Sequence, residues 1–233
     1  MSILKKAKTQ GRMFVGIYGP EGSGKSRTAV EIAIAGRKTL GLTGPIVALD
    51  TEHAYGFQAR RIKEATGEDL LIASTRSVQS LRDGLKEAKE AGASICIVDS
   101  VTHFLRELRE EYRKKKGKES LDVGDYVAAD RPFKSLLDAM LRSHSNIILC
   151  GREGQKYGLR KNSRGTWVQG PVASKMNAGE AGYEVDLLLE LSRKEGKTGG
   201  WTREANVKKD RSDTVSAQTF QVPWDPAEAL AGY

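Results

Sequence analysis

The stretch "IYGPEGSGKSRTAVEIA", residues 17–33, leads from an apolar run into a segment whose apolar residues recur at helical spacing. Within it, the pattern G-x-x-x-x-G-K-[ST] is satisfied by Gly19, Gly24, Lys25 and Ser26. Glycines let the backbone curl until consecutive N–H groups point at one phosphate, and the start of the following helix adds partial positive charge. The stretch therefore predicts a phosphate-binding loop (P-loop). Its expected binding residues are Gly19, Pro20, Glu21, Gly22, Ser23, Gly24, Lys25, Ser26 and Arg27.

The lysine and the serine of the P-loop have separate expected roles. Lys25 would reach the β- and γ-phosphates of a nucleoside triphosphate, and the Ser26 hydroxyl would hold Mg²⁺. The alternative is a glycine-rich turn that matches the pattern by chance. The position between an apolar strand and a helix argues against that alternative, because the motif requires this context.

Two acidic residues at strand ends are candidates for the remaining chemistry. Asp99 ends the apolar run "ICIVD", where a carboxylate can hold the water shell of Mg²⁺. The next residue is Ser100 rather than a glutamate, so a general base must come from elsewhere. Glu52 lies two residues beyond the apolar run 45–50 and could orient the water that attacks the γ-phosphate. The alternatives are an ordinary strand-end aspartate and a solvated loop glutamate.

The order of apolar runs predicts an α/β fold. Strand-length runs occupy residues 13–18, 45–50, 94–99, 146–151 and 185–191, and helical stretches occupy 26–38, 78–91 and 132–141. Strands that alternate with helices favour a parallel sheet covered on both faces. After about residue 185 the segments alternate polar and apolar residues, which predicts an antiparallel extension. We expect a basic N-terminal segment (1–12), one domain (13–222) and a tail (223–233).

Composition narrows the class of protein. A formal charge of +8 and a pI near 9.4 favour a polyanionic partner, although lysine-rich faces also serve solubility alone. The two cysteines, Cys96 and Cys150, lie in short apolar runs, so we expect buried and reduced thiols. No apolar run is long enough to span a bilayer, which predicts a soluble cytoplasmic protein without a membrane partner.

Three motifs in order resemble the ATPase core of the RecA-type recombinases: "IYGPEGSGKS", "ALDTEHAYG" and "ICIVDSVTHF". The resemblance runs from about residue 13 to 215. It implies a RecA-like P-loop NTPase with a mostly parallel twisted sheet flanked by helices, and an ATPase that uses ATP and Mg²⁺. By this resemblance Lys25 and Ser26 bind the triphosphate and Mg²⁺, Glu52 is the catalytic glutamate, and Asp99 is the second Mg²⁺ ligand.

The segment after the strand at 146–151 corresponds to a DNA-binding loop in that family. Here it reads "QKYGLRKNSRGTWVQG", residues 155–170, and mixes basic with aromatic residues. Cations can track the phosphates of a single strand while rings stack on its bases; a solvated loop is the alternative. The candidate DNA-binding residues are Lys156, Tyr157, Arg160, Lys161, Arg164 and Trp167.

Two further features come from the same resemblance. "NVKKDRSD", residues 206–213, is similar to the paired basic residues that reach an ATP held by the neighbouring subunit, which implies that Lys209 and Arg211 act in trans within a homo-oligomer. A charged hairpin end is the alternative. At the switch position, where the family has an amide side chain, this chain has Gly151, Arg152 and Glu153.

The chain resembles the compact RecA-type ATPases of phage recombination modules, which act with single-strand annealing and DNA-binding proteins. We therefore expect a DNA-stimulated ATPase that binds single-stranded DNA and assists homologous recombination or strand annealing, in the host cytoplasm if phage-encoded. A single-strand DNA-binding protein is a candidate partner. The alternatives are a RecA-fold ATPase that regulates or remodels protein partners without binding DNA, and a small-molecule kinase. Tyr55 or Phe57 could stack on the base or belong to the core.

Overall fold

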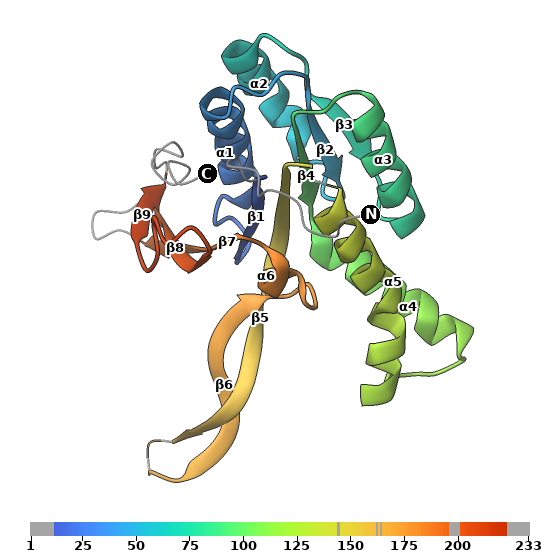
Figure 1. Cartoon of the computed structure of the whole chain (residues 1–233). Coiled ribbons are helices and arrows are strands. Elements are labelled where there is room, and N and C mark those ends of the chain that lie inside the picture. Colours follow the sequence, from blue (N-terminus) through green and yellow to red (C-terminus); the bar gives the residue numbers. More distant parts are fainter. Residues whose placement is uncertain (1–11, 144, 162, 164, 196–200, 223–233) are drawn as a thin grey trace, which may run out of the picture.

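The computed structural model describes residues 12–143, 145–161, 163, 165–195 and 201–222. Within these residues nine strands form one sheet in the order β3-β2-β4-β5-β1-β7-β8-β9, and β6 pairs with β5 alone (Figure 1). The strands are β1 (Phe14–Gly19), β2 (Ile46–Asp50), β3 (Leu71–Ser74), β4 (Ile95–Asp99), β5 (Ile147–Lys161), β6 (Trp167–Met176), β7 (Leu187–Glu195), β8 (Trp201–Asp210) and β9 (Thr219–Val222). The helices are α1 (Lys25–Thr39), η1 (Tyr55–Gln58), α2 (Ala59–Thr66), α3 (Val78–Glu90), α4 (Val101–Lys115), α5 (Val123–Arg142) and α6 (Ala181–Glu184).

The central strands are buried on both faces. Alternate residues of β1 belong to two apolar clusters: Val15 and Ile17 pack with α1 and α2, whereas Phe14 and Tyr18 pack with α3, α4 and α5. All residues of β1, β2 and β4 are buried for this reason. The predicted α/β fold with a mostly parallel sheet is confirmed, since β1, β2, β3, β4, β5 and β7 pair in parallel.

The C-terminal part follows the predicted antiparallel pattern. β8 pairs antiparallel with β7, and β9 pairs antiparallel with β8. Cys96 and Cys150 are free and buried, as expected from their apolar surroundings. No helix among the described residues is both long and apolar enough to cross a membrane. The predicted tail and most of the basic N-terminal segment lie outside the described residues, so the domain boundaries stay predictions.

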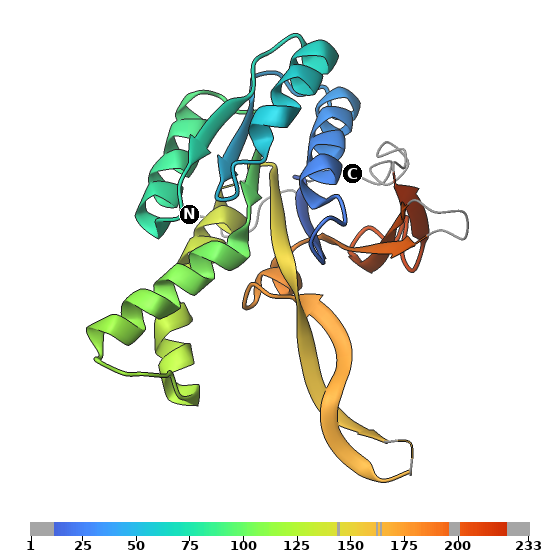
Figure 2. The same cartoon turned by 180° about the vertical axis from the view of Figure 1, so that it is seen from behind.

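The segment expected to be a loop at 155–170 is largely a β-hairpin. The strand predicted over 146–151 continues to Lys161, and residues 153–161 pair with residues 167–176 of β6. We call these paired segments the ribbon. The ribbon projects from the body of the molecule on the same side as the far ends of α4 and α5 (Figures 1 and 2). The ribbon contains several glycines and no regular alternation of polar and apolar residues, so the sequence does not predict its two strands.

The helix predicted over 132–141 starts earlier, at Val123. Asp122 caps it: the Asp122 side chain accepts from the Asp125 N–H while the Asp125 side chain accepts from the Asp122 N–H. Pro132 lies inside this helix. A proline inside a periodic segment normally indicates the start of a helix. The sequence therefore predicts a helix that starts at Pro132 and leaves out the turns before it.

Candidate nucleotide-binding site

The P-loop lies at the carboxyl end of β1 and depends on its glycines. Gly22 and Gly24 have φ angles of 70° and 95°, in the left-handed region that glycine adopts without strain. A Cβ atom at Gly19 would overlap the carbonyl oxygen of Leu191, and one at Gly22 would overlap the guanidinium of Arg193. A side chain at position 19 would push the loop away from the β7 backbone, and one at position 22 would displace the Arg193 guanidinium.

The start of α1 suits an anion. Gly24 is the N-cap, no side chain caps the helix, and its first turn holds no acidic residue, so side chains leave the first N–H groups to a ligand. The Lys25 ammonium donates to the carbonyls of Gly19 at 3.1 Å and Pro20 at 2.8 Å, which holds it over the loop. This donor set fits the phosphates of a nucleotide.

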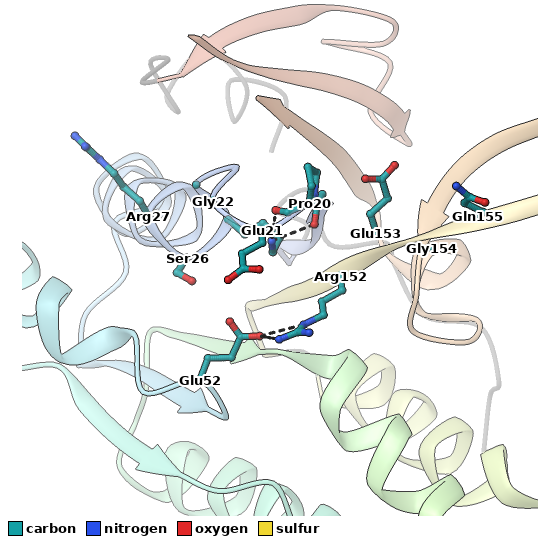
Figure 3. A pocket seen from close by; sticks show the side chains of 13 residues that line it. Pro20, Glu21, Gly22, Ser26, Arg27, Glu52, Arg152, Glu153, Gly154 and Gln155 are labelled. Atoms are coloured by element: carbon teal, nitrogen blue, oxygen red, sulfur yellow. Dashed lines mark hydrogen bonds and ion pairs between the residues drawn. The ribbon is translucent and has the colours of Figure 1, made fainter. Parts of the chain in front are cut away.

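A cavity of about 590 Å³ opens beside the loop. Arg152 and Glu52 face one another in this cavity, while the side chain of Arg27 points away from them (Figure 3). Ser23 does not line the cavity and is buried. The lining residues are Gly19, Pro20, Glu21, Gly22, Gly24, Lys25, Ser26, Arg27, Glu52, Arg152, Glu153, Gly154 and Gln155.

The two expected Mg²⁺ ligands are in contact. Ser26 Oγ donates to Asp99 Oδ2 at 2.6 Å, and the Tyr55 hydroxyl donates to the same oxygen at 3.1 Å. Asp99 is only 2% exposed. Burial raises the pKa of its carboxyl to about 6, although the hydrogen bonds from Ser26 and Tyr55 oppose this rise. A hydroxyl beside a buried carboxylate fits a hydrated Mg²⁺ bound together with phosphates.

The raised pKa of Asp99 predicts a pH effect on nucleotide binding. Below about pH 6 a proton should compete with Mg²⁺ for Asp99, so the gain in nucleotide affinity from Mg²⁺ should fall by up to about tenfold per pH unit. Calorimetric titrations with and without EDTA across this pH range would measure it. Asp99→Asn should show a smaller Mg²⁺ effect, and the pH dependence that remains in this variant comes from protonation of the nucleotide itself. An identical pH profile in both proteins would contradict the prediction.

Glu52 lies in a small polar network beyond the end of β2. Its N–H donates to Asp50 Oδ1 at 2.9 Å, and its carboxylate is 3.1 Å from the Arg152 guanidinium and 3.5 Å from His103 Nε2. Thr51 Oγ1 lies 2.6 Å from His103 Nδ1. Burial, reinforced by Arg152, lowers the pKa of His103, so its ring is neutral near pH 7. The carboxylate therefore faces the cavity with a cationic and a neutral neighbour.

The aromatic candidates for base stacking lie apart from this cavity. Tyr55 is fully buried and donates to Asp99, so it belongs to the core. Phe57 is 87% exposed and does not line the cavity. The hairpin of β7 and β8 instead forms the outer wall of the P-loop: Arg203 Nε donates to the Gly22 carbonyl at 3.2 Å, and Arg193 stacks on Trp201 at 3.6 Å from the ring centroid.

Lys209 and Arg211 lie at the opposite edge of the sheet from the P-loop. Lys209 pairs in register with Leu188 near the start of β7 and donates to the Tyr183 carbonyl. Arg211 donates to Asp186 Oδ1 at 2.7 Å. The structure does not bring these two residues to the nucleotide cavity of their own chain, and a role in trans stays a prediction.

The candidate DNA-binding residues belong to the ribbon and its tip. Lys156 and Lys161 are exposed, Trp167 is 62% exposed, and the Lys161 ammonium lies 5.4 Å from the centroid of the Trp167 ring. Tyr157 and Arg160 lie in β5, but their side chains are not described. Arg164 lies outside the described residues.

Several cavity residues carry no local sequence signal. The sequence marks Arg152 and Glu153 only by the switch position and Gln155 only as the start of the predicted DNA-binding loop, and it marks Gly154 by nothing, yet all four line the cavity. They reach it because β5 pairs with β1 in a register that sets Arg152 beside Gly19. Arg193 and Arg203 reach the P-loop through the pairing of β7 with β1 and β8. These are long-range pairings, which no local motif encodes.

Comparison with known proteins identifies the family. The family described as "AAA domain" (AAA_24) matches residues 12–217. The chain belongs to this AAA domain family. The match covers the P-loop of the AAA domain and strands β1 to β8, including the ribbon, and it ends before β9.

Other comparisons place this AAA domain among known folds. No curated protein matches its sequence. Among solved structures it is similar to a KaiC-like protein from the hyperthermophilic archaeon Pyrococcus horikoshii OT3, with a TM-score of 0.59 and 17% identity over 89% of this chain and 83% of that chain. The AAA domain thus has a P-loop fold of the RecA/KaiC-like type.

Proposed function

We propose that this AAA domain is a Mg²⁺-dependent ATPase that holds single-stranded DNA on its ribbon and assists homologous recombination or strand annealing. The observation that carries the proposal is the position of the ribbon. Residues 153–155, at its root, belong to the wall of the cavity beside the P-loop. The phosphates of a bound nucleotide would contact β5 at the root of the ribbon, and DNA would contact the same strand farther out (Figure 1). One continuous strand would therefore connect the two ligands.

The chemistry of the ribbon supports a nucleic-acid ligand. The ribbon has one acidic residue, Glu153 at its root, and from there to Met176 the chain has five basic residues and no further acidic residue. The basic residues are Lys156, Arg160, Lys161, Arg164 and Lys175. The exposed ring of Trp167 adds a surface on which a base can stack. Because single strands expose both phosphates and bases, they match this combination better than a duplex does.

The cavity residues divide the work of hydrolysis. Lys25 and the first N–H groups of α1 bind the phosphates, and Ser26 and Asp99 hold the cation in place. Mg²⁺, when bound, neutralises charge on the phosphate oxygens. Glu52 accepts a proton from the attacking water and orients it. The neutral ring of His103 lies 3.5 Å from this carboxylate, so its Nε2 contacts the same oxygen that would receive the proton.

We also propose that the protein forms a homo-oligomer in which Lys209 and Arg211 act on the ATP of a neighbouring subunit. This arrangement predicts that two chains with different defects restore each other's ATPase activity. A Lys209→Ala/Arg211→Ala chain keeps its own Glu52, and a Glu52→Gln chain keeps both basic residues. If the basic residues complete a neighbour's site, mixing the two should restore part of the ATPase activity, because some interfaces then combine intact halves. Steady-state phosphate release measures the recovery. No recovery in mixtures shown to co-assemble would contradict action in trans.

The salt dependence of DNA affinity tests the ribbon directly. Lys161→Ala/Arg164→Ala should lower the slope of log affinity against log salt by about 1.4, because each phosphate neutralised on a single strand contributes about 0.7. Trp167→Ala should weaken binding by about fivefold or more at every salt concentration, through lost stacking worth about 1–3 kcal/mol. Fluorescence anisotropy with a labelled oligonucleotide measures both effects.

Matched variants separate the ribbon from general charge. Lys86→Ala/Lys89→Ala removes two positive charges from α3 and should leave the slope unchanged, and Trp167→Phe should retain most of the stacking. A non-hydrolysable ATP analogue should tighten DNA binding through β5. If neither ribbon variant changes the affinity, or the wild type does not bind single strands at low salt, the protein would act on a protein partner. The exposed Leu159 and Trp167 would then be candidate contacts for that partner.

A further inference from the structure

An ion pair in the nucleotide cavity joins β5 to the loop that follows β2. Arg152 Nε and Nη2 both donate to Glu52 Oε1, at 3.4 and 3.1 Å (Figure 3). The side chains are 47% and 34% exposed, so solvent reaches the pair and it can be broken. Both residues line the same cavity as Lys25 and Ser26. The guanidinium is thus within the space that a nucleotide would enter.

The backbone of Arg152 is held firmly while its side chain is free to turn. Its N–H donates to Thr102 Oγ1 at 2.9 Å, and its carbonyl accepts from the Asn177 N–H at 2.8 Å. The Thr102 hydroxyl in turn donates to the Asn177 carbonyl at 2.7 Å. Beyond this clamp, Glu52 is the only hydrogen-bond partner of the guanidinium among the described residues. Only side-chain torsions need to change for it to find another partner.

Among the described residues, Arg152 is the one permanently charged partner in an ion pair with Glu52. His103 also approaches Oε1, but the lowered pKa keeps its ring neutral near pH 7. We assign the remaining ring proton to Nε2, because that nitrogen faces the carboxylate while Thr51 lies at Nδ1. A carboxylate bound to a guanidinium is a weaker proton acceptor than a free one, so the pair opposes the role of Glu52 in hydrolysis.

We infer that Arg152 is a positioning residue that exchanges partners: it holds Glu52 in an ion pair, and the phosphates of ATP take the guanidinium and release the carboxylate to orient water. The inference rests on the proposed ATP site. Guanidinium binds phosphate and carboxylate by the same planar donors, so the two anions compete for it. A triphosphate brings more negative charge into the cavity than a diphosphate does, and it therefore competes more strongly with Glu52.

A double-mutant cycle on nucleotide binding tests this exchange. The quantity to measure is the preference for a non-hydrolysable ATP analogue over ADP, as a ratio of calorimetric dissociation constants. Arg152→Gln should lower this preference by about tenfold or more, the usual effect of losing a charge-assisted hydrogen bond. Glu52→Gln should raise it, because the neutral amide competes with the phosphates for Arg152 less strongly than the carboxylate does. In the double variant Arg152→Gln/Glu52→Gln, the rise due to Glu52→Gln should be about threefold to tenfold smaller.

The second half of the cycle separates competition from simple repulsion. If Glu52 only repels phosphate, Glu52→Gln raises the preference equally with Arg152 or Gln at position 152, and the inference is overturned. Arg152→Lys keeps the positive charge and should recover part of the preference for the ATP analogue. Such a recovery would exclude misfolding as the reason for the low preference of Arg152→Gln. An unchanged preference in Arg152→Gln would also overturn it. A wild type that binds neither nucleotide would overturn the proposed ATP site itself, whereas additive effects on measurable binding overturn the exchange alone.

Discussion

Replacing Lys25 by alanine should weaken ATP binding by about a hundredfold or more and abolish hydrolysis. Among the described residues, Lys25 is the only lysine that lines the cavity. Its ammonium would form charge-assisted contacts with the phosphates, each worth about 1.5–3 kcal/mol. The fold should survive, because within the part of the chain that the structure describes the Lys25 ammonium donates hydrogen bonds only to two carbonyls of its own loop. Equilibrium dialysis with labelled ATP and thermal melting by circular dichroism would measure the two properties separately.

Lys38→Ala is the matched control for this experiment. Lys38 lies on the same helix, α1, and is exposed. Thirteen residues at about 1.5 Å each put it roughly 20 Å from Lys25 along the helix axis. The control should bind and hydrolyse ATP as the wild type does. Unchanged ATP affinity and turnover in a folded Lys25→Ala protein would exclude the P-loop as the nucleotide site.

Glu52→Gln should separate binding from chemistry. The amide keeps the size of the side chain and its place beside Arg152, but it cannot accept a proton from water. Hydrolysis should therefore fall by about 10²- to 10⁴-fold, the usual contribution of a positioned base, while ATP still binds. Single-turnover phosphate release at saturating ATP would measure the loss without interference from binding.

The control for Glu52→Gln is the same change at Glu64. Glu64 is exposed on α2, where it pairs with Arg60 four residues away, and it lines no part of the nucleotide cavity. Its replacement by glutamine should leave turnover unchanged. If Glu52→Gln hydrolyses ATP at the wild-type rate, the water is activated by a group other than Glu52.

The core of the fold could be predicted from the sequence because its strands are buried on both faces. Such strands appear as short, nearly continuous apolar runs, and the runs at 45–50 and 94–99 differ from β2 and β4 by one residue at the start. The edge strand β3 was not predicted, because its four residues are largely exposed and do not form a continuous apolar run. α2 escaped because, within its eight residues, Ile62 alone is buried.

Some residues of the nucleotide site could be predicted from local sequence motifs, whereas others depend on the pairing of distant strands. The P-loop is one continuous stretch whose glycines and lysine must stand at fixed spacing, so a single sequence contains its whole signal. Asp99 and Glu52 follow recognisable strands, and parallel strands end at one edge of the sheet. The contact of Arg152 with Glu52 joins residues 100 positions apart. It depends on the order of β2, β4 and β5 in the sheet, which no local pattern reveals.

The ribbon has a consequence for the energetics of any ligand it holds. Beyond Arg152, β5 has no partner other than β6, and β6 pairs with nothing else among the described residues. A hairpin without a third strand is only marginally stable in water, so the ribbon opens locally at a lower free energy than the sheet from which it extends. A ligand that binds the closed ribbon must offset this opening, and part of its contact energy is used to order backbone. A ligand that binds the ribbon more tightly should therefore also protect the amide hydrogens of the ribbon more strongly from exchange with solvent.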